Sequence, residues 1–177
     1  MDLKCRDVIY EWLEHSHVKE FWDNSQDFKD DLLIFINGRK SHSSYFNGIF
    51  TYWIGKTNGE PYCLVMTSEV VLNESLPQVW KDNISGSGKT YTIDFCIGNK
   101  NYLGKGLASL TLETFTKFFQ KDIYCNADTF FIDPNENNPR AKHVYEKAGF
   151  EIVDTFDMGI GFFKGHKFLL MVKKLSN

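Results

Sequence analysis

The chain has 177 residues, of which 42% are hydrophobic and 24% are charged, and its formal net charge is −3. This length fits one domain with a substantial core, and this composition excludes fibrous and disordered proteins. Lysine and arginine form no run interleaved with aromatic residues, so a nucleic-acid partner is not expected. The mild acidity is compatible with a cationic substrate.

The cysteines and histidines give no sign of a metal site. Cys5, Cys63, Cys96 and Cys125 are widely spaced and form no C-x-x-C pair, which favours free thiols over a disulfide framework or a zinc site. The histidines lack metal-ligand spacing, so we expect surface positions for them and no bound metal. No segment resembles a signal peptide or a membrane span. We therefore expect a cytoplasmic protein with no membrane partner.

The first part of the chain predicts two helices and a hairpin. Apolar stripes predict a short helix ending near residue 13 and a second helix around residues 27–39. Strand-like runs follow at residues 50–55 and 62–67. Asn58-Gly59 between them is a strong hairpin signal, because both residues accept a positive φ.

The middle of the chain alternates strands and helices. Residues 73–89 are polar and predict a loop, and residues 91–97 alternate as a strand with two distinct faces. A glycine turn at residues 103–106 then opens a helix, and residues 129–133 predict the next strand. The side of that helix expected to face the core carries Leu107, Leu110, Phe115 and Phe118.

The next helix has clear boundaries. Asn138 can cap it, Pro139 suits its first position, and Gly149 suits the residue past its end. Residues 150–175 predict two final strands. The whole order predicts an α/β or α+β sheet with a central βαβα unit, in a single domain over residues 1–177.

Two glycine-rich segments are candidate phosphate sites. Gly104 and Gly106 precede a helix, where free backbone N–H groups can approach an anion, although an ordinary turn is the alternative. The other segment, Gly86-Ser-Gly-Lys-Thr90, is similar to the end of a Walker A loop. That motif lacks its first glycine, which is Asn83 here, and a strand follows it rather than a helix. We therefore interpret it as a flexible loop.

The segment Asn138-Pro-Arg-Ala-Lys-His-Val-Tyr-Glu-Lys-Ala-Gly-Phe150 resembles the N-x-x-A-x-x-x-Y-x-K-x-G-F helix of the GNAT acetyltransferases. Their pyrophosphate loop, Q/R-x-x-G-x-G/A, corresponds to Asn101-Tyr-Leu-Gly-Lys-Gly106, in which Asn101 replaces the usual Gln or Arg. The resemblance implies a mixed, mostly antiparallel sheet flanked by helices, with strands splayed at the acetyl-CoA site.

Within that superfamily the chain is similar to aminoglycoside 6'-N-acetyltransferases. The matching segments are Tyr10 to Trp22, Ile93-Asp94, Leu103 to Leu107 and Asp133-Pro134. The tail, residues 151–177, looks longer than the usual ending of that family. The resemblance implies a small, polycationic amine substrate and a monomer or homodimer.

The resemblance also implies acetyl-CoA as co-substrate. Its pyrophosphate would bind the amides of Leu103–Ser109, and its pantetheine would pair with the strand edge at Phe95–Ile97, where an amide could stabilise the thioester oxygen. The residues expected to contact it are Phe95, Cys96, Ile97, Tyr102, Leu103, Gly104, Lys105, Gly106, Leu107, Ala108, Ser109, Asn138, Ala141 and Tyr145.

The expected catalytic residues are Tyr145, Asp94 and Asp133. In the family the tyrosine protonates or solvates the leaving thiolate, whereas helical spacing alone indicates a core tyrosine. Asp94 would orient the amine and accept its proton, and the alternative for it is a solvent-facing strand residue. Asp133 either faces the same cleft or is a turn residue before Pro134. Trp22 is the expected aromatic wall of the substrate pocket.

Three other functions stay open. Acetyltransferases of hydroxylysine-type siderophore precursors share the Trp-rich N-terminal helix and the Asp-Pro, but they typically place a histidine at the position of Asp94. A protein N-terminal acetyltransferase would need a peptide groove, for which the sequence gives no sign. A non-catalytic acyl-CoA sensor would need Gly104 and Gly106 but neither Asp94 nor Tyr145.

Overall fold

The structure is a computed structural model that describes residues 3–39 and 42–176. Its helices are α1 (Leu3–Leu13), α2 (Ser16–Lys19), α3 (Gln26–Ile36), η1 (Tyr45–Asn47), α4 (Gln78–Lys81), η2 (Lys100–Tyr102), α5 (Leu107–Phe118), η3 (Phe119–Ile123) and α6 (Pro139–Lys147). Its strands are β1 (Thr51–Thr57), β2 (Glu60–Glu69), β3 (Lys89–Ile97), β4 (Ala127–Ile132), β5 (Glu151–Asp157) and β6 (Lys167–Lys174). No helix of the described chain is long and apolar enough to cross a membrane.

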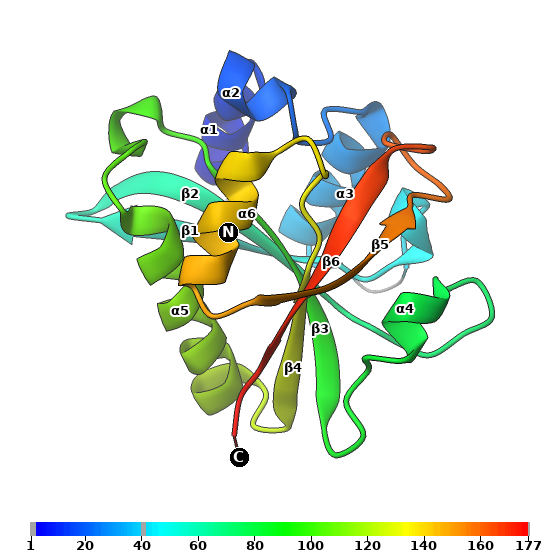
Figure 1. Cartoon of the computed structure of the whole chain (residues 1–177). Coiled ribbons are helices and arrows are strands. Elements are labelled where there is room, and N and C mark those ends of the chain that lie inside the picture. Colours follow the sequence, from blue (N-terminus) through cyan, green and yellow to red (C-terminus); the bar gives the residue numbers. More distant parts are fainter. Residues whose placement is uncertain (1–2, 40–41, 177) are drawn as a thin grey trace.

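One mixed sheet forms the centre of the molecule (Figure 1). Its six strands run in the order β1-β2-β3-β4-β6-β5, and only the β3–β4 pair is parallel. The β1–β2 hairpin turns at Asn58 and Gly59, whose φ angles of 51° and 80° fit the two positive positions of a tight hairpin turn. These observations confirm the expected mostly antiparallel sheet and its first hairpin.

Helices cover both faces of this sheet. On one face α5 and α6 pack against Val65, Ile93 and Phe130, which belong to one apolar cluster. On the other face α1 and α3 pack against Leu64 and Met66, and α4 covers the part formed by β5 and β6. Because successive strand side chains alternate between faces, the odd-numbered Ile93 points toward α5 and α6, whereas Asp94 points toward the N-terminal helices.

The boundaries of α6 match the sequence expectation. The Asn138 side chain accepts a hydrogen bond from the Ala141 amide at 3.1 Å, Pro139 is the first helical residue, and Gly149 has a φ of +87°. This short helix therefore begins and ends at fixed points. Its buried side then carries Tyr145 into the apolar layer between α6 and the sheet.

Two local expectations were wrong. Leu110 and Phe118 of α5 are 58% and 39% exposed, because the buried stripe is the one that contains Leu112, a residue 200° around the helix from Leu110 at about 100° per residue. The polar segment 73–89 contains α4, and its Walker-like end is held in place: Ser87 donates a hydrogen bond to the Asp128 carboxylate at 2.8 Å. That end is an anchored turn rather than a flexible loop.

A buried polar network fixes the segment after α3. The Asp31 carboxylate is fully buried and accepts hydrogen bonds from Arg39 at 2.8 Å, from the Tyr52 hydroxyl at 2.6 Å and from Ser43. Arg39 and Ser43 are therefore both held by one carboxylate. Ser43 lies two residues before Tyr45, which lines the candidate site.

Candidate active site

The site begins where β3 and β4 separate. Their last aligned pair is Thr92 with Phe131, yet β3 continues to Ile97. The Gly98 amide donates to the Tyr62 carbonyl on the β2 side, so the backbone groups of even-numbered residues face β2. The backbone groups of Phe95 and Ile97 therefore face the gap beyond the end of β4, and those of Cys96 do not.

Two histidines hold the N-terminal helices against this end of β3. His17 lies 2.9 Å from the Ile97 carbonyl oxygen, and His15 lies 3.1 Å from the carbonyl oxygen of Gly98. Both side chains are partly buried, so the expected surface position is wrong for this pair. The short spacing His-Ser-His after α1 brings both rings to consecutive carbonyls.

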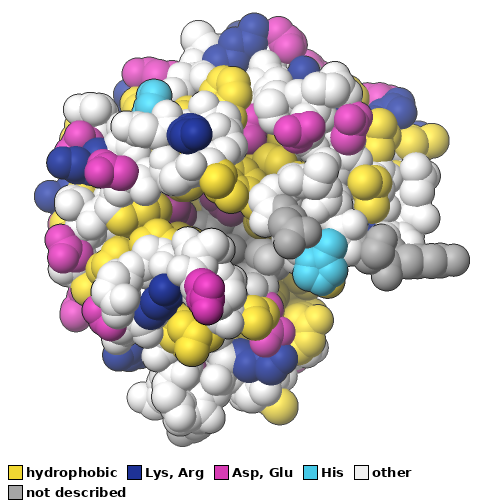
Figure 2. All heavy atoms as spheres, turned by 90° about the vertical axis from the view of Figure 1, so that its right-hand side faces the viewer, with side chains coloured by type: hydrophobic (Ala, Val, Ile, Leu, Met, Phe, Trp, Pro, Cys, Tyr) yellow, Lys and Arg dark blue, Asp and Glu magenta, His cyan; other side chains and the backbone are white. Residues whose placement is uncertain are grey.

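A cavity of about 1820 Å³ passes through the gap. Small-molecule sites typically enclose about 300–1,000 Å³, so this one has room for two molecules of moderate size. Its walls come from α2, η1, β2, β3, the start of α5, the end of β4, α6 and the loop after β5. The face that carries α4 and that loop is visibly hollowed (Figure 2).

The glycine turn forms one end of the cavity. Gly104 and Gly106 both have a φ of +72°, a conformation that other residues rarely adopt, and a Cβ at either position would meet no atom within 4 Å. Open space thus lies above the turn, and the first amides of α5 have no partner within their own helix. A backbone site for an anion exists here without any side chain.

The free amides are fewer than the sequence predicted. The Leu103 amide donates to the Lys100 carbonyl at 3.2 Å, so the set available to a ligand begins at Gly104. Tyr102 turns away: its hydroxyl donates to Glu60, its ring packs near Tyr62, and it does not line the cavity. The 3₁₀ turn at η2 causes both effects, because it uses the amides of residues 102 and 103 to close on itself.

The other residues expected to contact the cofactor do line the cavity. They are Phe95, Cys96, Ile97, Leu103, Gly104, Lys105, Gly106, Leu107, Ala108, Ser109, Asn138, Ala141 and Tyr145. Three basic side chains, Lys105, Arg140 and Lys147, also line the cavity, and Lys105 belongs to the glycine turn itself. This end therefore combines unpaired amides with positive charge, as a phosphate-bearing ligand requires.

Carboxylates occupy the opposite side of the gap. Asp94 lies on β3, Asp133 follows β4 directly, and both line the cavity. Burial raises the pKa of Asp94 to about 7, and the nearby charge of Asp23 adds to this effect. Burial also raises the pKa of Asp133 well above its usual range, followed by the charge of Asp94. The fold therefore places two carboxyl groups together where at least one tends to keep its proton.

Tyr145 reaches the gap from α6. Its side chain is 7% exposed, and burial raises the pKa of its hydroxyl, with further contributions from Asp94, Cys96 and Asp133. The tyrosine is thus within electrostatic range of both carboxylates, although Asp94 points to the other face of β3. The gap between β3 and β4 brings side chains from the two faces of the sheet together. The Tyr145 hydroxyl keeps its proton at neutral pH and can donate it.

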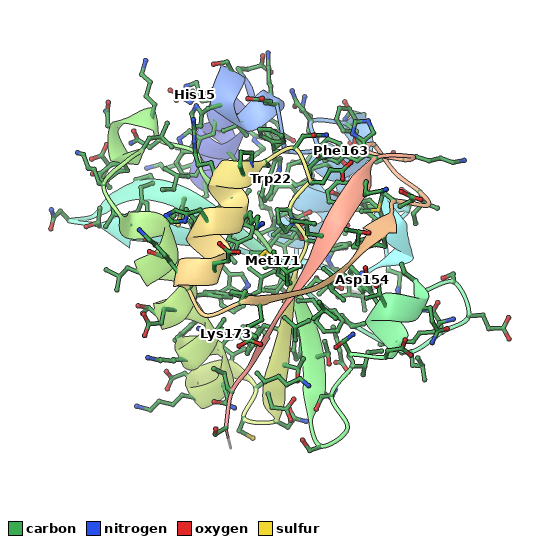
Figure 3. All side chains as sticks on the ribbon, in the orientation of Figure 1. His15, Trp22, Asp154, Phe163, Met171 and Lys173 are labelled. Atoms are coloured by element: carbon green, nitrogen blue, oxygen red, sulfur yellow. The ribbon has the colours of Figure 1, made fainter. Side chains whose placement is uncertain are left out.

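Trp22 lies at the end of the molecule that carries α2 and the start of α6 (Figure 3). It is 8% exposed, lines the cavity and packs edge-on against Phe28 at a centroid distance of 6.0 Å. Its indole N–H has no hydrogen-bond acceptor among residues 3–39 and 42–176. Trp22 therefore lines the cavity and brings an unsatisfied donor to it, and its part in substrate binding stays a prediction.

Asp23 lines the site, although the sequence pattern did not predict it as a site residue. Its carboxylate is buried, lines the cavity and accepts a hydrogen bond from the Ser25 amide at 2.8 Å. Burial raises the pKa of the nearby Tyr45 hydroxyl well above its usual range, and the charge of Asp23 adds to this effect. In the sequence, an Asp two residues before a helix-capping Ser has the form of an ordinary turn. Only the neighbouring Trp22 could have suggested a site.

The described residues contain no group of three or more His, Cys, Asp or Glu side chains arranged to hold a metal ion. The carboxylates at the gap belong to a different type of site. They face a protonated tyrosine and the backbone groups of β3 that β4 does not pair, an arrangement that suits proton transfer during acyl transfer.

Comparison with known proteins agrees with this geometry. Over 150 residues the chain is 29% identical to aminoglycoside N(6')-acetyltransferases type 1 of Klebsiella pneumoniae and Serratia marcescens, covering 81% of this chain and 68% of theirs. The crystal structure of an aminoglycoside N(6')-acetyltransferase from Legionella pneumophila superposes with a TM-score of 0.73 at 26% identity, covering 97% of this chain and 87% of that one.

A structure of AAC(6')-Ib with parmomycin and acetyl-CoA superposes with a TM-score of 0.70 at 25% identity, covering 98% of this chain and 90% of that one. The same enzyme with coenzyme A and kanamycin gives the same TM-score and identity. Residues 5–158 match the family described as acetyltransferase (GNAT) domain, and the chain therefore belongs to that family.

Proposed function

We propose that this chain transfers the acetyl group of acetyl-CoA to a primary amine of an aminoglycoside, at the 6' position. The observation that carries the proposal is the meeting of Asp94, Asp133 and Tyr145 at the gap between β3 and β4. The relatives named as aminoglycoside N(6')-acetyltransferases, and the one solved with kanamycin and coenzyme A, support the choice of substrate.

The residues at the basic end fit acetyl-CoA. The unpaired amides from Gly104 to Ser109, with the open space above both glycines, suit its pyrophosphate. The inward backbone groups of Phe95 and the amide of Ile97, whose carbonyl contacts His17, suit a pantetheine arm lying where a further strand would pair. When bound there, acetyl-CoA supplies a thioester whose oxygen can accept a hydrogen bond from the Phe95 amide.

The acidic end then handles the amine and its proton. Asp94 accepts a proton from the incoming amine, since a pKa of about 7 makes it an effective base at neutral pH. The amine nitrogen forms a bond to the acetyl carbon, and the bond from that carbon to sulfur breaks. Tyr145, which keeps its proton, donates it to the departing sulfur or solvates that sulfur. Asp133, whose pKa is also raised, lies beside Asp94 and can bind the substrate by a hydrogen bond.

The direct test is release of the CoA thiol from acetyl-CoA with a panel of acceptors: kanamycin, tobramycin, N6-hydroxylysine and a short peptide. We expect release with the two aminoglycosides, and loss of release when their 6'-amine is replaced by a hydroxyl. Release with hydroxylysine alone would transfer the protein to siderophore chemistry. Acetyl-CoA binding without release for any acceptor would favour a non-catalytic sensor.

A further inference from the structure

Asp23 is a buried carboxylate that the proposed reaction does not yet use. It comes from the turn between α2 and α3, whereas Asp94 comes from the middle of the sheet, and both line one cavity. The Ser25 amide donates a hydrogen bond to the Asp23 side chain at 2.8 Å, and Tyr45 is close enough for the charge of Asp23 to raise its pKa. Two backbone segments 71 residues apart in sequence, the difference between positions 94 and 23, thus bring two carboxyl groups to the same space.

Among the described residues, no lysine or arginine is found to act on Asp94 or Asp133. The titratable groups that act on Asp94 or respond to it are Asp23, Asp133, Tyr45, Tyr52, Cys96 and Tyr145. Each of them is neutral or negative. Carboxylates withdrawn from water without a cationic partner are costly, so this part of the cavity favours a ligand with positive charge.

The residue beside Asp23 gives an independent sign that a ligand binds here. Trp22 is more than nine-tenths buried, lines the same cavity, and carries an indole N–H without an acceptor in the described chain. A buried donor normally has a partner, and a ligand oxygen would supply one. A hydroxyl or ring oxygen next to an ammonium group would satisfy Trp22 and Asp23 together.

We propose that Asp23 binds a second ammonium group of the acceptor, so that the preferred substrate is an amino sugar with two amines on the sugar that carries the reacting one. Asp94 then serves the reacting amine, while the Asp23 carboxylate binds the neighbouring ammonium group. An acceptor with a single amine on that sugar leaves one buried carboxylate unbalanced. This inference rests on the function proposed above.

The test compares kanamycin B with kanamycin A, which carry an amine and a hydroxyl, respectively, at the 2' position of the sugar with the 6'-amine. We expect the chain to favour kanamycin B in kcat/KM by about tenfold or more, and Asp23→Asn to reduce this preference to about twofold or less. The matched control is Asp27→Asn, which removes the same charge from an exposed residue outside the cavity and should keep the preference.

A pH profile separates this role from a structural one. Because the charge of Asp23 contributes to the raised pKa of Asp94, Asp23→Asn should move the acidic limb of kcat/KM to lower pH. An equal rate with both kanamycins in the unmodified chain would overturn the inference and leave the proposed function intact. An unchanged preference for kanamycin B in Asp23→Asn would also overturn the inference and leave the proposed function intact. Failure to acetylate either kanamycin would overturn the proposed function, and this inference with it.

Discussion

The two sides of the gap are built in different ways. On the side of α5 and α6, the phosphate-type end depends on backbone conformation: two glycines at a φ of +72° and a helix N-terminus. On the side of α1, α2 and α3, the acidic end depends on side chains that distant segments bring together. The first kind of site depends on a few adjacent residues, whereas the second forms only after the sheet and helices have packed.

This difference has an energetic side. Glycine turns and helix caps cost little to form, since each stabilises a local conformation. Carboxylates withdrawn from water, such as the partly buried Asp94 and the fully buried Asp31, are unfavourable unless something balances them. Asp31 is balanced by Arg39, Tyr52 and Ser43, whereas Asp94 has no such partner in the described chain. Asp31 is therefore a structural carboxylate, whereas Asp94 is available to bind a ligand.

The largest effect is expected at Asp94. Asp94→Asn removes the proton acceptor, so kcat/KM should fall by about 10²–10⁴-fold with every amine substrate. The measurement is CoA thiol release, with acetyl-CoA affinity determined in parallel and expected to change little. Asp122→Asn, an exposed residue outside the cavity, is the control for loss of charge. A fully active Asp94→Asn protein would leave Asp94 without a catalytic part.

Asp31 should matter for stability rather than chemistry. Asp31→Ala leaves the buried Arg39 without its carboxylate, so we expect the free energy of unfolding to fall by about 3–5 kcal/mol in urea titrations. The neighbouring Asp30 is exposed on the same helix, and Asp30→Ala should change it by less than about 0.5 kcal/mol. Equal effects of the two substitutions would show that the hydrogen bonds of Asp31 do not stabilise the side of the fold that carries α1, α2 and α3.

The pH dependence of stability should separate the two carboxylates further. The folded pKa of Asp94, about 7, lies above its unfolded value of 3.8, so folding favours the protonated form. Its contribution to stability is fully present below the unfolded pKa and is lost as the pH rises through the folded one. Between pH 4 and pH 8, the free energy of unfolding should therefore fall by roughly 2–3 kcal/mol less in Asp94→Asn than in the unmodified chain. A parallel decline in both proteins would contradict the raised pKa.

These cases show what the sequence could and could not predict. The cap at Asn138, the end at Gly149 and the hairpin at Asn58 each depend on their own residue and its neighbours, and all three were predicted. Asp23 was missed because its role arises from contact with strands that lie far along the chain. Leu110 was placed in the core wrongly because helical spacing gives an apolar stripe without its rotation toward the sheet.

A more moderate loss is expected at Tyr145, which links the two sides. Tyr145→Phe should lower kcat by about 10- to 100-fold while leaving acetyl-CoA affinity unchanged, because the hydroxyl acts on the leaving group. The control is Tyr10→Phe, whose hydroxyl contacts the Lys29 carbonyl away from the cavity. A variant that loses acetyl-CoA affinity and keeps its turnover would make Tyr145 a binding residue and remove it from the chemistry.

The smallest effect tests the backbone side alone, through the two glycine-rich segments. At Gly106 the φ of +72° disfavours a β-branched residue, so Gly106→Val should distort the first amides of α5 and weaken acetyl-CoA binding by about tenfold. Gly86 belongs to the Walker-like segment, has open space around it and no positive φ, and Gly86→Val should bind acetyl-CoA normally. Titration calorimetry with both variants measures this. The preference for kanamycin B depends on the opposite side of the gap, so Gly106→Val should retain that preference at saturating acetyl-CoA. Loss of both acetyl-CoA affinity and the kanamycin preference in this variant would show that the two sides form one unit.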